Sequence, residues 1–440
     1  MATTIGLISL GCSKNRVDSE QMLGFLSAQG YEIVDDPARA EVIIVNTCGF
    51  IQSAKEEAIS TIFEMAEYKE TGKCRLLVAT GCFAQRYPEA IQEEMPEVDV
   101  IMGVNEYEKI DKAIKEAFAG ARPVYTDDDG SFFEFGRVLT TPRYRAYIRI
   151  GEGCATCCSY CAIPLIRGGY RSRPKVDIIA EVKRLAAEGV KEFTLIAQDT
   201  TRYGTDEGGE SKLPELIEEV AAIPGVEWLR ALYCYPERVD DRLLDTIARL
   251  PNVCNYLDLP MQHISQHILD DMNRTDTTEH IREVVHKFKA RGMMLRTTMM
   301  LGFPGETEED FQETLDVVRK VRYDSAFTFI YSRRTGTAAA KMDDQVPDEV
   351  AHARLDRLLN VVQKIGREET ARFEGQTMPV LAEKVNREDK NLLTGRTSQN
   401  TVVHFPGGED LIGKIVDVKL ERCQGFYYLG KMAGGAHAAG

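Results

Sequence analysis

The sequence predicts an α/β protein of three parts: an N-terminal open parallel α/β domain, a central partial (β/α) barrel and a small C-terminal antiparallel β-barrel. Two observations support this fold class. Short apolar runs alternate with longer amphipathic stretches up to about residue 335, which is the rhythm of βα units in parallel sheets. After about Phe373 the chain changes to short β-like runs separated by Gly, Asn and Asp, which is typical of small antiparallel barrels.

The N-terminal domain is predicted over residues 1–135 from three apolar runs. These runs are "TIGLISL", "VIIVNT" and "RLLVAT". Helical stretches at about residues 16–29 and from about Ala54 separate them, as the crossovers of a parallel sheet require. The rhythm lapses at residues 120–145, where an acidic stretch with Gly and Pro predicts a linker.

The central barrel is predicted over residues 140–370 from six further apolar runs. They are "AYIRI", "FTLIAQ", "WLRALYCY", "NYLDLP", "LRTTMMLG" and "FTFIYS", and each of the first five precedes a helical stretch. Six βα-type strands predict a partial or complete barrel. Runs such as "IGKIVDVKLERC" predict the small barrel over residues 374–434, and the small residues at 435–440 predict a flexible tail.

Composition and charge narrow the class of protein. The chain has 440 residues, 43% hydrophobic and 28% charged, as in ordinary soluble proteins. We find no apolar run near the roughly 20 residues of a membrane span and no signal-peptide pattern at the start, so we predict a cytoplasmic protein without a membrane partner. The net charge is −15, whereas nucleic-acid binders usually carry a basic surface that contacts phosphates. The acidic charge therefore argues against a nucleic-acid substrate.

Three cysteines share one structural context in the N-terminal domain. Cys12, Cys48 and Cys82 each follow the carboxyl end of a predicted strand. Those strand ends lie along one edge of an open parallel sheet, where ligands collect, so three thiolates could meet there. Eleven cysteines in such a chain are more typical of ligands or reduced thiols than of a disulfide framework. Zinc is possible, and an iron–sulfur cluster also suits three soft thiolates.

A second group of cysteines lies in "CATCCSYC", on the loop after the first barrel strand, where active sites of such barrels sit. Read as two Cys-x-x-Cys pairs, it is a closed four-thiolate metal site. Read as Cys-x-x-x-Cys-x-x-Cys, it uses Cys154, Cys158 and Cys161, omits Cys157, and leaves one metal position open. Closed zinc sites usually separate their pairs by a dozen or more residues, so the spacing favours the second reading without excluding the first.

The flanking sequence resembles known families. "GEGCATCCSYCAIPLIRGGYRSRP" resembles the radical S-adenosylmethionine superfamily. "SLGCSKNRVDSE", "VNTCGFI", "ATGCFAQRYP" and "GFPGETEEDF" are similar to methylthiotransferases, and "AQDTTRYG", "LYCYPERV" and "YSRRTGT" are most similar to the RimO branch. The terminal small barrel resembles a TRAM domain. Cys157 departs from the expected pattern, which places a non-cysteine residue there.

The resemblance implies a radical enzyme that methylthiolates the β-carbon of an aspartate in small-subunit ribosomal protein S-twelve. Cys154, Cys158 and Cys161 would hold one 4Fe–4S cluster, to which S-adenosyl-L-methionine binds. A second 4Fe–4S cluster, carrying the sulfur, would be held by the three cysteines of the N-terminal domain. An electron donor such as flavodoxin or ferredoxin is the other partner that we expect.

Further polar residues are expected at the ends of the barrel strands, where the resemblance implies a cofactor-binding rim. The residues predicted to contact S-adenosyl-L-methionine are Tyr160, Gln198, Gly302 and Gly305. The other rim residues are Asp199, Tyr235, Pro236, Gln262 and His263. A structural role is an alternative for His263, a tight turn for "GFPGE", and a solvated face for Arg167, Arg171 and Arg173.

Three functions remain to be distinguished. The first is the ribosomal-protein methylthiotransferase, and the second is a related enzyme that methylthiolates an adenosine of transfer RNA. The third, a non-catalytic electron carrier or zinc scaffold, does not explain a large barrel rimmed with polar residues. The acidic chain favours a basic ribosomal protein over RNA as the partner, because complementary charges attract.

Overall fold

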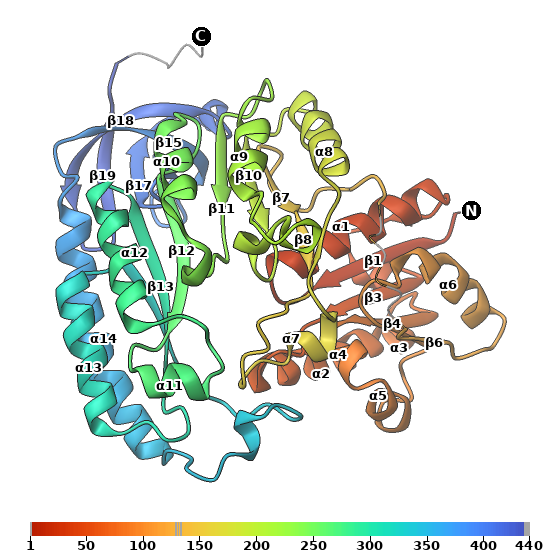
Figure 1. Cartoon of the computed structure of the whole chain (residues 1–440). Helices are drawn as coiled ribbons and strands as arrows, with labels where there is room; N and C mark the ends of the chain where they lie inside the picture. The colour runs from red at the N-terminus through yellow and green to blue at the C-terminus, as the bar shows by residue number, and fades with distance from the viewer. Residues whose placement is uncertain (1, 128–129, 131, 133, 435–440) are drawn as a thin grey trace.

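The computed structural model describes residues 2–127, 130, 132 and 134–434, in three packed units (Figure 1). The predicted tail at 435–440 lies outside the described residues. The first unit is an open, entirely parallel sheet in the order β2-β1-β3-β4-β5-β6. Its strands are β1 (Thr4–Ser9), β2 (Glu32–Ile33), β3 (Val42–Thr47), β4 (Leu76–Gly81), β5 (Val100–Met102) and β6 (Val124–Tyr125).

Helices cover both faces of this sheet. They are α1 (Ser13–Ala28), α2 (Gln52–Ala66), α3 (Tyr68–Thr71), α4 (Cys82–Arg86), α5 (Pro88–Glu94) and α6 (Ile110–Phe118). The apolar sides of α1 and α6 pack on one face, and those of α2 and α5 on the other. The central strands β3 and β4 are buried along their whole length, which explains their continuous apolar runs. The sequence prediction missed β2, β5 and β6, which are too short to show a pattern.

The second unit is a partial barrel made of two parallel sheets, β7-β10-β11 and β12-β13-β14. The strands are β7 (Arg145–Arg149), β10 (Glu192–Ile196), β11 (Trp228–Ala231), β12 (Tyr256–Gln262), β13 (Met294–Leu301) and β14 (Ser325–Ile330). They correspond in order to the six predicted runs. In the described part of the chain, an isolated parallel bridge between Leu229 of β11 and Val253, just before β12, links the two sheets. Within the described residues no pairing links β14 back to β7, so the barrel is open on one side.

Helices line the outside of the partial barrel (Figure 1). They are α8 (Lys175–Ala187), α9 (Leu213–Ala221), α10 (Asp241–Arg249), α11 (Gln266–Asp271), α12 (Thr278–Ala290), α13 (Glu308–Val321) and α14 (Asp348–Ala371). The loop after β7 carries the short hairpin of β8 (Gly151–Glu152) and β9 (Arg171–Ser172), with α7 (Ile163–Arg167) between them. We find no helix in the described parts of the chain that is both long and apolar enough to span a membrane.

The predicted linker is more ordered than its composition suggested. Its first part contributes the edge strand β6, and Arg137 in its second part is buried. The Arg137 guanidinium pairs with Glu20 of α1 at 2.5 Å and with Glu181 of α8 at 2.6 Å. The segment therefore joins the first unit to the barrel through buried charges, which a composition-based interpretation could not detect.

The third unit is a closed barrel in the order β15-β16-β17-β19-β18. Its strands are β15 (Thr377–Val385), β16 (Leu392–Thr397), β17 (Val402–Pro406), β18 (Ile415–Cys423) and β19 (Tyr427–Met432). As predicted, the small barrel is mainly antiparallel; only β17 and β19 pair in parallel. The small barrel packs at the amino ends of the central strands, where Arg145 pairs with Glu383 at 2.5 Å. In Figure 1 it lies at the far end from α7 and α11.

Candidate active site

Cys12, Cys48 and Cys82 meet at the carboxyl edge of the first sheet. Cys12 immediately precedes α1, Cys48 follows β3, and Cys82 is the first residue of α4. Gly11 has a φ of +88°, and a Cβ there would lie 2.9 Å from the Cβ of Cys48, so only glycine allows this approach. The Asn15 Oδ1 atom accepts from the thiols of Cys12 at 3.8 Å and Cys82 at 3.6 Å. The convergence expected from the strand ends is therefore present.

The buried thiols of this group are costly to ionise unless a metal binds the resulting thiolates. Burial, opposed by Arg167 and reinforced by the neighbouring Cys12 and Cys48, raises the pKa of Cys82 to about 12. Burial also raises the pKa of Cys48. A metal cluster whose iron atoms bind these thiolates would offset both penalties, because the positive charge of the metal replaces the protons. All eleven cysteines of the chain are free thiols, so no disulfide competes.

The second group of cysteines separates into three that converge and one that does not. Cys154 and Cys158 are buried and Cys161 is half-buried. Burial, followed by the charges of Cys158 and Cys154, raises the pKa of Cys161 to about 12. Cys157 is exposed, with a left-handed φ of 52°. Its carbonyl accepts a hydrogen bond from Asn273 Nδ2 at 3.0 Å. This geometry supports the reading that omits Cys157.

Neither group is arranged around a single point. Among the described residues, no set of three or more His, Cys, Asp and Glu side chains is close enough to hold one metal ion. A cubane iron–sulfur cluster spreads its thiolate ligands over separate iron atoms, so its cysteines stand farther apart than those of a zinc ion. Two sets of three thiols, of which only Cys12 is exposed, fit such a group in their chemistry.

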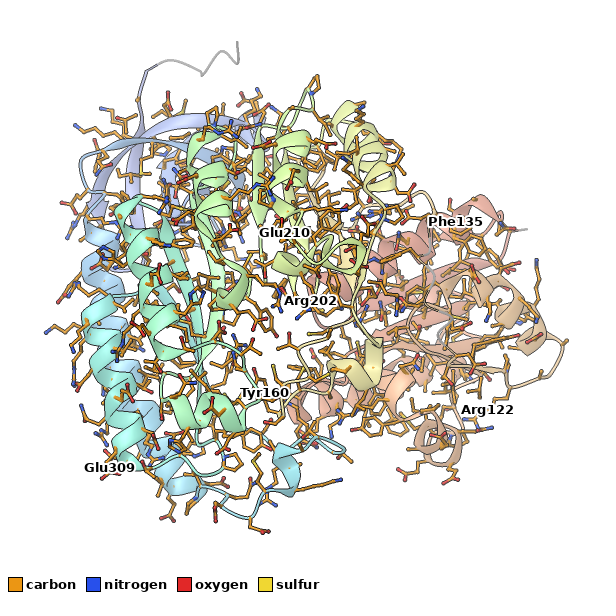
Figure 2. All side chains as sticks on the ribbon, viewed as in Figure 1. Arg122, Phe135, Tyr160, Arg202, Glu210 and Glu309 are labelled. Atoms are coloured by element: carbon orange, nitrogen blue, oxygen red, sulfur yellow. The ribbon has the colours of Figure 1, made fainter. Side chains whose placement is uncertain are left out.

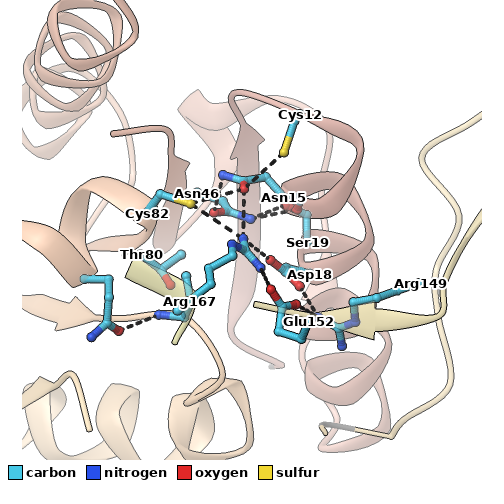
Figure 3. Close-up of polar contacts among 12 residues, drawn as sticks. Cys12, Asn15, Asp18, Ser19, Asn46, Thr80, Cys82, Arg149, Glu152 and Arg167 are labelled. Carbon is cyan, nitrogen blue, oxygen red and sulfur yellow. Dashed lines mark hydrogen bonds and ion pairs between the residues drawn. The ribbon is translucent and has the colours of Figure 1, made fainter. Parts of the chain in front are cut away.

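The two cysteine sets are neighbours across the interface between the first sheet and the barrel. Cys82 and Val104 pack against Ala162 and Ile166, which follow Cys161 by one and five positions. At the end of α7, Arg167 Nη2 donates to Cys82 Sγ at 3.6 Å and to Asn15 Oδ1 at 3.0 Å (Figure 3). A helix that begins just after one cysteine set therefore ends beside the other.

Four buried charges hold this interface together (Figure 3). Asp18 of α1 pairs with Arg149 at 2.6 Å and with Arg167 at 2.9 Å. Glu152 pairs with Arg167 at 3.0 Å and with Arg149 at 3.3 Å. Burial alone would raise the pKa of Glu152, but Arg167 and Arg149 lower it to about 2. Two arginines and two carboxylates balance one another, which a dry interface requires.

Only part of this network can be predicted from the sequence. A solvated face was the alternative for Arg167 and Arg173, and both are buried. Asn15, Asp18 and Glu152 were not singled out at all. The available signal was the run of polar residues directly after Cys12, at positions that a helix would place on one side.

Tyr160 and the "GFPGE" turn come together, as the predicted cofactor rim requires. The rings of Tyr160 and Phe303 are 6.4 Å apart in an edge-on arrangement. Gly302 and Gly305 have φ values of 68° and 83°, so both flanks of the turn need glycine. The Tyr160 carbonyl accepts from Arg334 Nη1 at 2.8 Å. Figure 2 places Tyr160 near the lower end of the barrel, toward the first unit.

Gln198 follows β10, in the other sheet of the partial barrel from the "GFPGE" turn, and lies beside the charge network. Its Nε2 donates to Glu152 Oε1 at 2.7 Å, whereas its buried Oε1 has no partner among the described residues. Among the other rim residues, Asp199 is buried and accepts from Thr201 Oγ1 at 2.6 Å. His263 Nδ1 accepts from the Ser265 amide at 3.0 Å, and burial lowers the pKa of this imidazole to about 4. The hydrogen bond at Nδ1 gives His263 a structural role.

Three family models match successive parts of the chain. Residues 4–103 match "Uncharacterized protein family UPF0004", residues 148–318 match the radical SAM superfamily, and residues 371–433 match the TRAM domain. These ranges cover most of the first sheet, most of the partial barrel and the closed small barrel. The second range contains the whole "CATCCSYC" loop.

Solved structures share the architecture at low sequence identity. TsrM from Kitasatospora setae, a radical S-adenosylmethionine methyltransferase, matches with a TM-score of 0.57 and 16% identity, over 77% of this chain and 74% of that chain. OxsB, a cobalamin-dependent S-adenosylmethionine radical enzyme, matches with a TM-score of 0.51 and 12% identity, over 82% of this chain and 56% of that chain. At such identities the likeness concerns the fold alone.

Curated relatives match over nearly the full length. The protein named ribosomal protein uS12 methylthiotransferase RimO from Desulforamulus reducens is 44% identical over 98% of this chain and 99% of its own. Relatives of the same name from Clostridioides difficile and Geobacter sulfurreducens are 43% and 42% identical, each over 97% of this chain and 98% of its own. The chain therefore belongs to the RimO family of radical S-adenosylmethionine methylthiotransferases.

Proposed function

We propose that this chain adds a methylthio group to the β-carbon of an aspartate in ribosomal protein uS12. The observation that carries the proposal is the meeting of two cysteine sets across one buried interface, since the reaction needs a radical source and a sulfur source close together. The names of the relatives supply the substrate.

Each cysteine set has its own role in this proposal. Cys154, Cys158 and Cys161 hold the 4Fe–4S cluster to which S-adenosyl-L-methionine binds. The second 4Fe–4S cluster is held by Cys12, Cys48 and Cys82. When bound, these groups supply a carbon radical able to attack an unactivated C–H bond, and the sulfur to be inserted. Protein side chains alone have no comparable chemistry.

The remaining assignments concern the residues that bind and enclose the cofactor. Tyr160, Gln198, Gly302 and Gly305 contact S-adenosyl-L-methionine. The unpartnered Oε1 of Gln198 supports this, because a buried acceptor without a donor is costly unless a ligand supplies one. The charge network around Arg167 seals the interface and keeps both cysteine sets at a fixed separation.

The proposal extends to the organisation and surroundings of the chain. We assign residues 1–135 to the sulfur-cluster domain, 140–370 to the radical domain and 374–434 to the TRAM domain. The electron comes from a small donor such as flavodoxin or ferredoxin. A ribosomal substrate implies that the enzyme works in the cytoplasm.

The test is to offer both family substrates to the reconstituted, reduced enzyme with S-adenosyl-L-methionine and sulfide. We expect uS12 to gain the mass of one methylthio group on one aspartate, and transfer RNA to remain unmodified. Digestion and tandem mass spectrometry locate the modification. Modified adenosine beside unmodified uS12 would instead assign the chain to the transfer-RNA branch.

A further inference from the structure

Lys14 places a buried ammonium group beside the first cysteine set, at the carboxyl ends of the barrel strands. It lies in the first turn of α1, two positions after Cys12, and is 7% exposed. Its Nζ donates to the carbonyl of Ala197 at 3.2 Å and lies 3.4 Å from the centroid of the Tyr233 ring. Ala197 and Tyr233 follow the carboxyl ends of β10 and β11. The charge therefore sits at the face of the barrel where reactants bind.

This ammonium group is not neutralised by the protein. In the described parts of the chain no carboxylate forms an ion pair with Lys14, which has only the carbonyl and the ring as partners. The nearby network offers no spare charge, because Asp18 and Glu152 are already balanced by Arg149 and Arg167. Buried lysines are almost always paired, since an uncompensated buried charge is costly. A carbonyl and a cation–π contact offset only part of that cost.

The partner of Lys14 is held in a strained conformation. Tyr233 has a left-handed φ of 61°, which is rare for an aromatic residue. Its carbonyl accepts from the Thr200 amide at 2.9 Å, and its hydroxyl lies 3.3 Å from Ser13 Oγ. Strain of this kind clusters at functional sites. The ring and the hydroxyl are thus fixed against the start of α1.

We propose that Lys14 binds the side-chain carboxylate of the substrate aspartate and selects aspartate over uncharged targets. This inference rests on the proposed function. The carboxylate carbon of aspartate is bonded directly to the β-carbon that reacts. A hydrogen bond from Lys14 to a carboxylate oxygen therefore fixes an atom that is only two bonds from the reacting carbon. The same contact supplies the negative charge that Lys14 lacks. The adenine base that the transfer-RNA branch modifies carries no such charge, so this pairing favours the protein substrate.

The test is a double-mutant cycle between Lys14 and the target aspartate. Binding of uS12, and of uS12 with the target aspartate changed to asparagine, is measured on reconstituted wild-type enzyme and on Lys14→Met. We expect asparagine to weaken binding about 10-fold or more in wild type and less than about 2-fold in Lys14→Met, because the charge pair exists only in the first case. With uS12 that keeps its target aspartate, the kcat/KM of Lys14→Met should be about 100-fold below that of the wild-type enzyme.

Two further variants separate the charge from the fold. Lys14→Arg keeps the charge and should retain part of the discrimination between aspartate and asparagine. Lys14→Gln is a second neutral variant in case Lys14→Met does not fold. Lys55→Met is the matched control, because Lys55 also lies over an aromatic ring, that of Tyr87 at 5.5 Å, but on α2 and not at the carboxyl ends of the barrel strands. Its discrimination and kcat/KM should equal those of wild type.

Three results would overturn the inference. Equal loss of binding for the aspartate and asparagine proteins would show that Lys14 does not contact the carboxylate. A raised KM for S-adenosyl-L-methionine, with unchanged discrimination, would make the cofactor's carboxylate the partner. Lower iron content or a changed electron paramagnetic resonance spectrum would mean that Lys14 balances the charge of a cluster. A wild-type enzyme that modifies no aspartate would instead refute the proposed function itself.

Discussion

At the scale of single residues, neighbouring cysteines have opposite surroundings. Cys158 is buried beside Arg274 and Tyr160, whereas Cys157 is exposed and has a left-handed backbone. Successive side chains in a loop point in different directions, so two adjacent thiols rarely serve one cluster. The structure thus supports the Cys-x-x-x-Cys-x-x-Cys reading on geometric grounds as well as on spacing.

We predict that changing Cys154, Cys158 or Cys161 to alanine removes one cluster and all cleavage of S-adenosyl-L-methionine. Cys157→Ala should retain both clusters, because its thiol lies outside the convergent set. Iron and sulfide analysis after anaerobic reconstitution measures the first effect, and release of 5′-deoxyadenosine measures the second. An iron loss in Cys157→Ala equal to that in Cys158→Ala would contradict the assignment.

The cysteines of the first sheet should be separable from radical chemistry. With Cys12, Cys48 and Cys82 all changed to alanine, cleavage of S-adenosyl-L-methionine should remain measurable, since the other set lies on a different domain. Methylthio product should fall below detection, because the sulfur site is gone. Both products can be followed in one reaction by liquid chromatography and mass spectrometry. Continued methylthiolation of uS12 would place the sulfur site elsewhere.

At the scale of elements, the linker and α8 form a buried joint. Glu181 of α8 pairs with Arg137 of the linker and with Arg173, and all three side chains are buried. Burial alone would raise the pKa of Glu181, but Arg137 and Arg173 lower it to about 2. A carboxyl group whose pKa is lower in the folded state stabilises the fold above its ordinary pKa near 4.5. That contribution is lost as the pH falls toward 2.

We therefore predict that Glu181→Gln destabilises the barrel by roughly 3 kcal/mol at pH 7, because it leaves buried arginines without a full counter-charge. The difference from wild type should shrink as the pH falls from about 4.5 toward 2, as wild-type Glu181 becomes protonated. Urea unfolding followed by fluorescence of the single tryptophan, Trp228 in β11, measures it.

Glu219→Gln is the matched control for this experiment. Glu219 pairs with Lys175 at 2.6 Å, but the two side chains are 45% and 53% exposed. Exposed pairs contribute at most about 1 kcal/mol, so little change is expected at any pH. If Glu181→Gln behaved like this control, the joint would not contribute to stability.

At the scale of the whole molecule, the net charge of −15 should govern how the enzyme meets its partner. Opposite charges speed diffusional encounter, and salt screens them. We predict that the association rate with basic uS12 falls about 10-fold or more when ionic strength rises from about 10 mM to about 150 mM, as the Debye length drops from about 30 Å to about 8 Å. Stopped-flow mixing measures this rate. A rate independent of salt would exclude electrostatic steering.

The sequence by itself determined the architecture and the chemical class. Alternating apolar runs predicted all six strands of the partial barrel in order, because the side-chain period of each strand and helix is local. The cysteine spacing, together with the family resemblance, indicated an iron–sulfur enzyme. Both signals are carried by residues close together in the chain, so no long-range information was needed.

Only the tertiary structure decided that the two cysteine sets lie beside one another. Asp18 and Arg149 are 131 positions apart, and Lys14 and Ala197 are 183 apart. Such contacts depend on how one folded unit docks against another, and no local periodicity encodes that. The burial of Arg167, the joint at Arg137 and the unpaired ammonium of Lys14 all arise from this docking, which is the physical reason that the sequence could not reveal them.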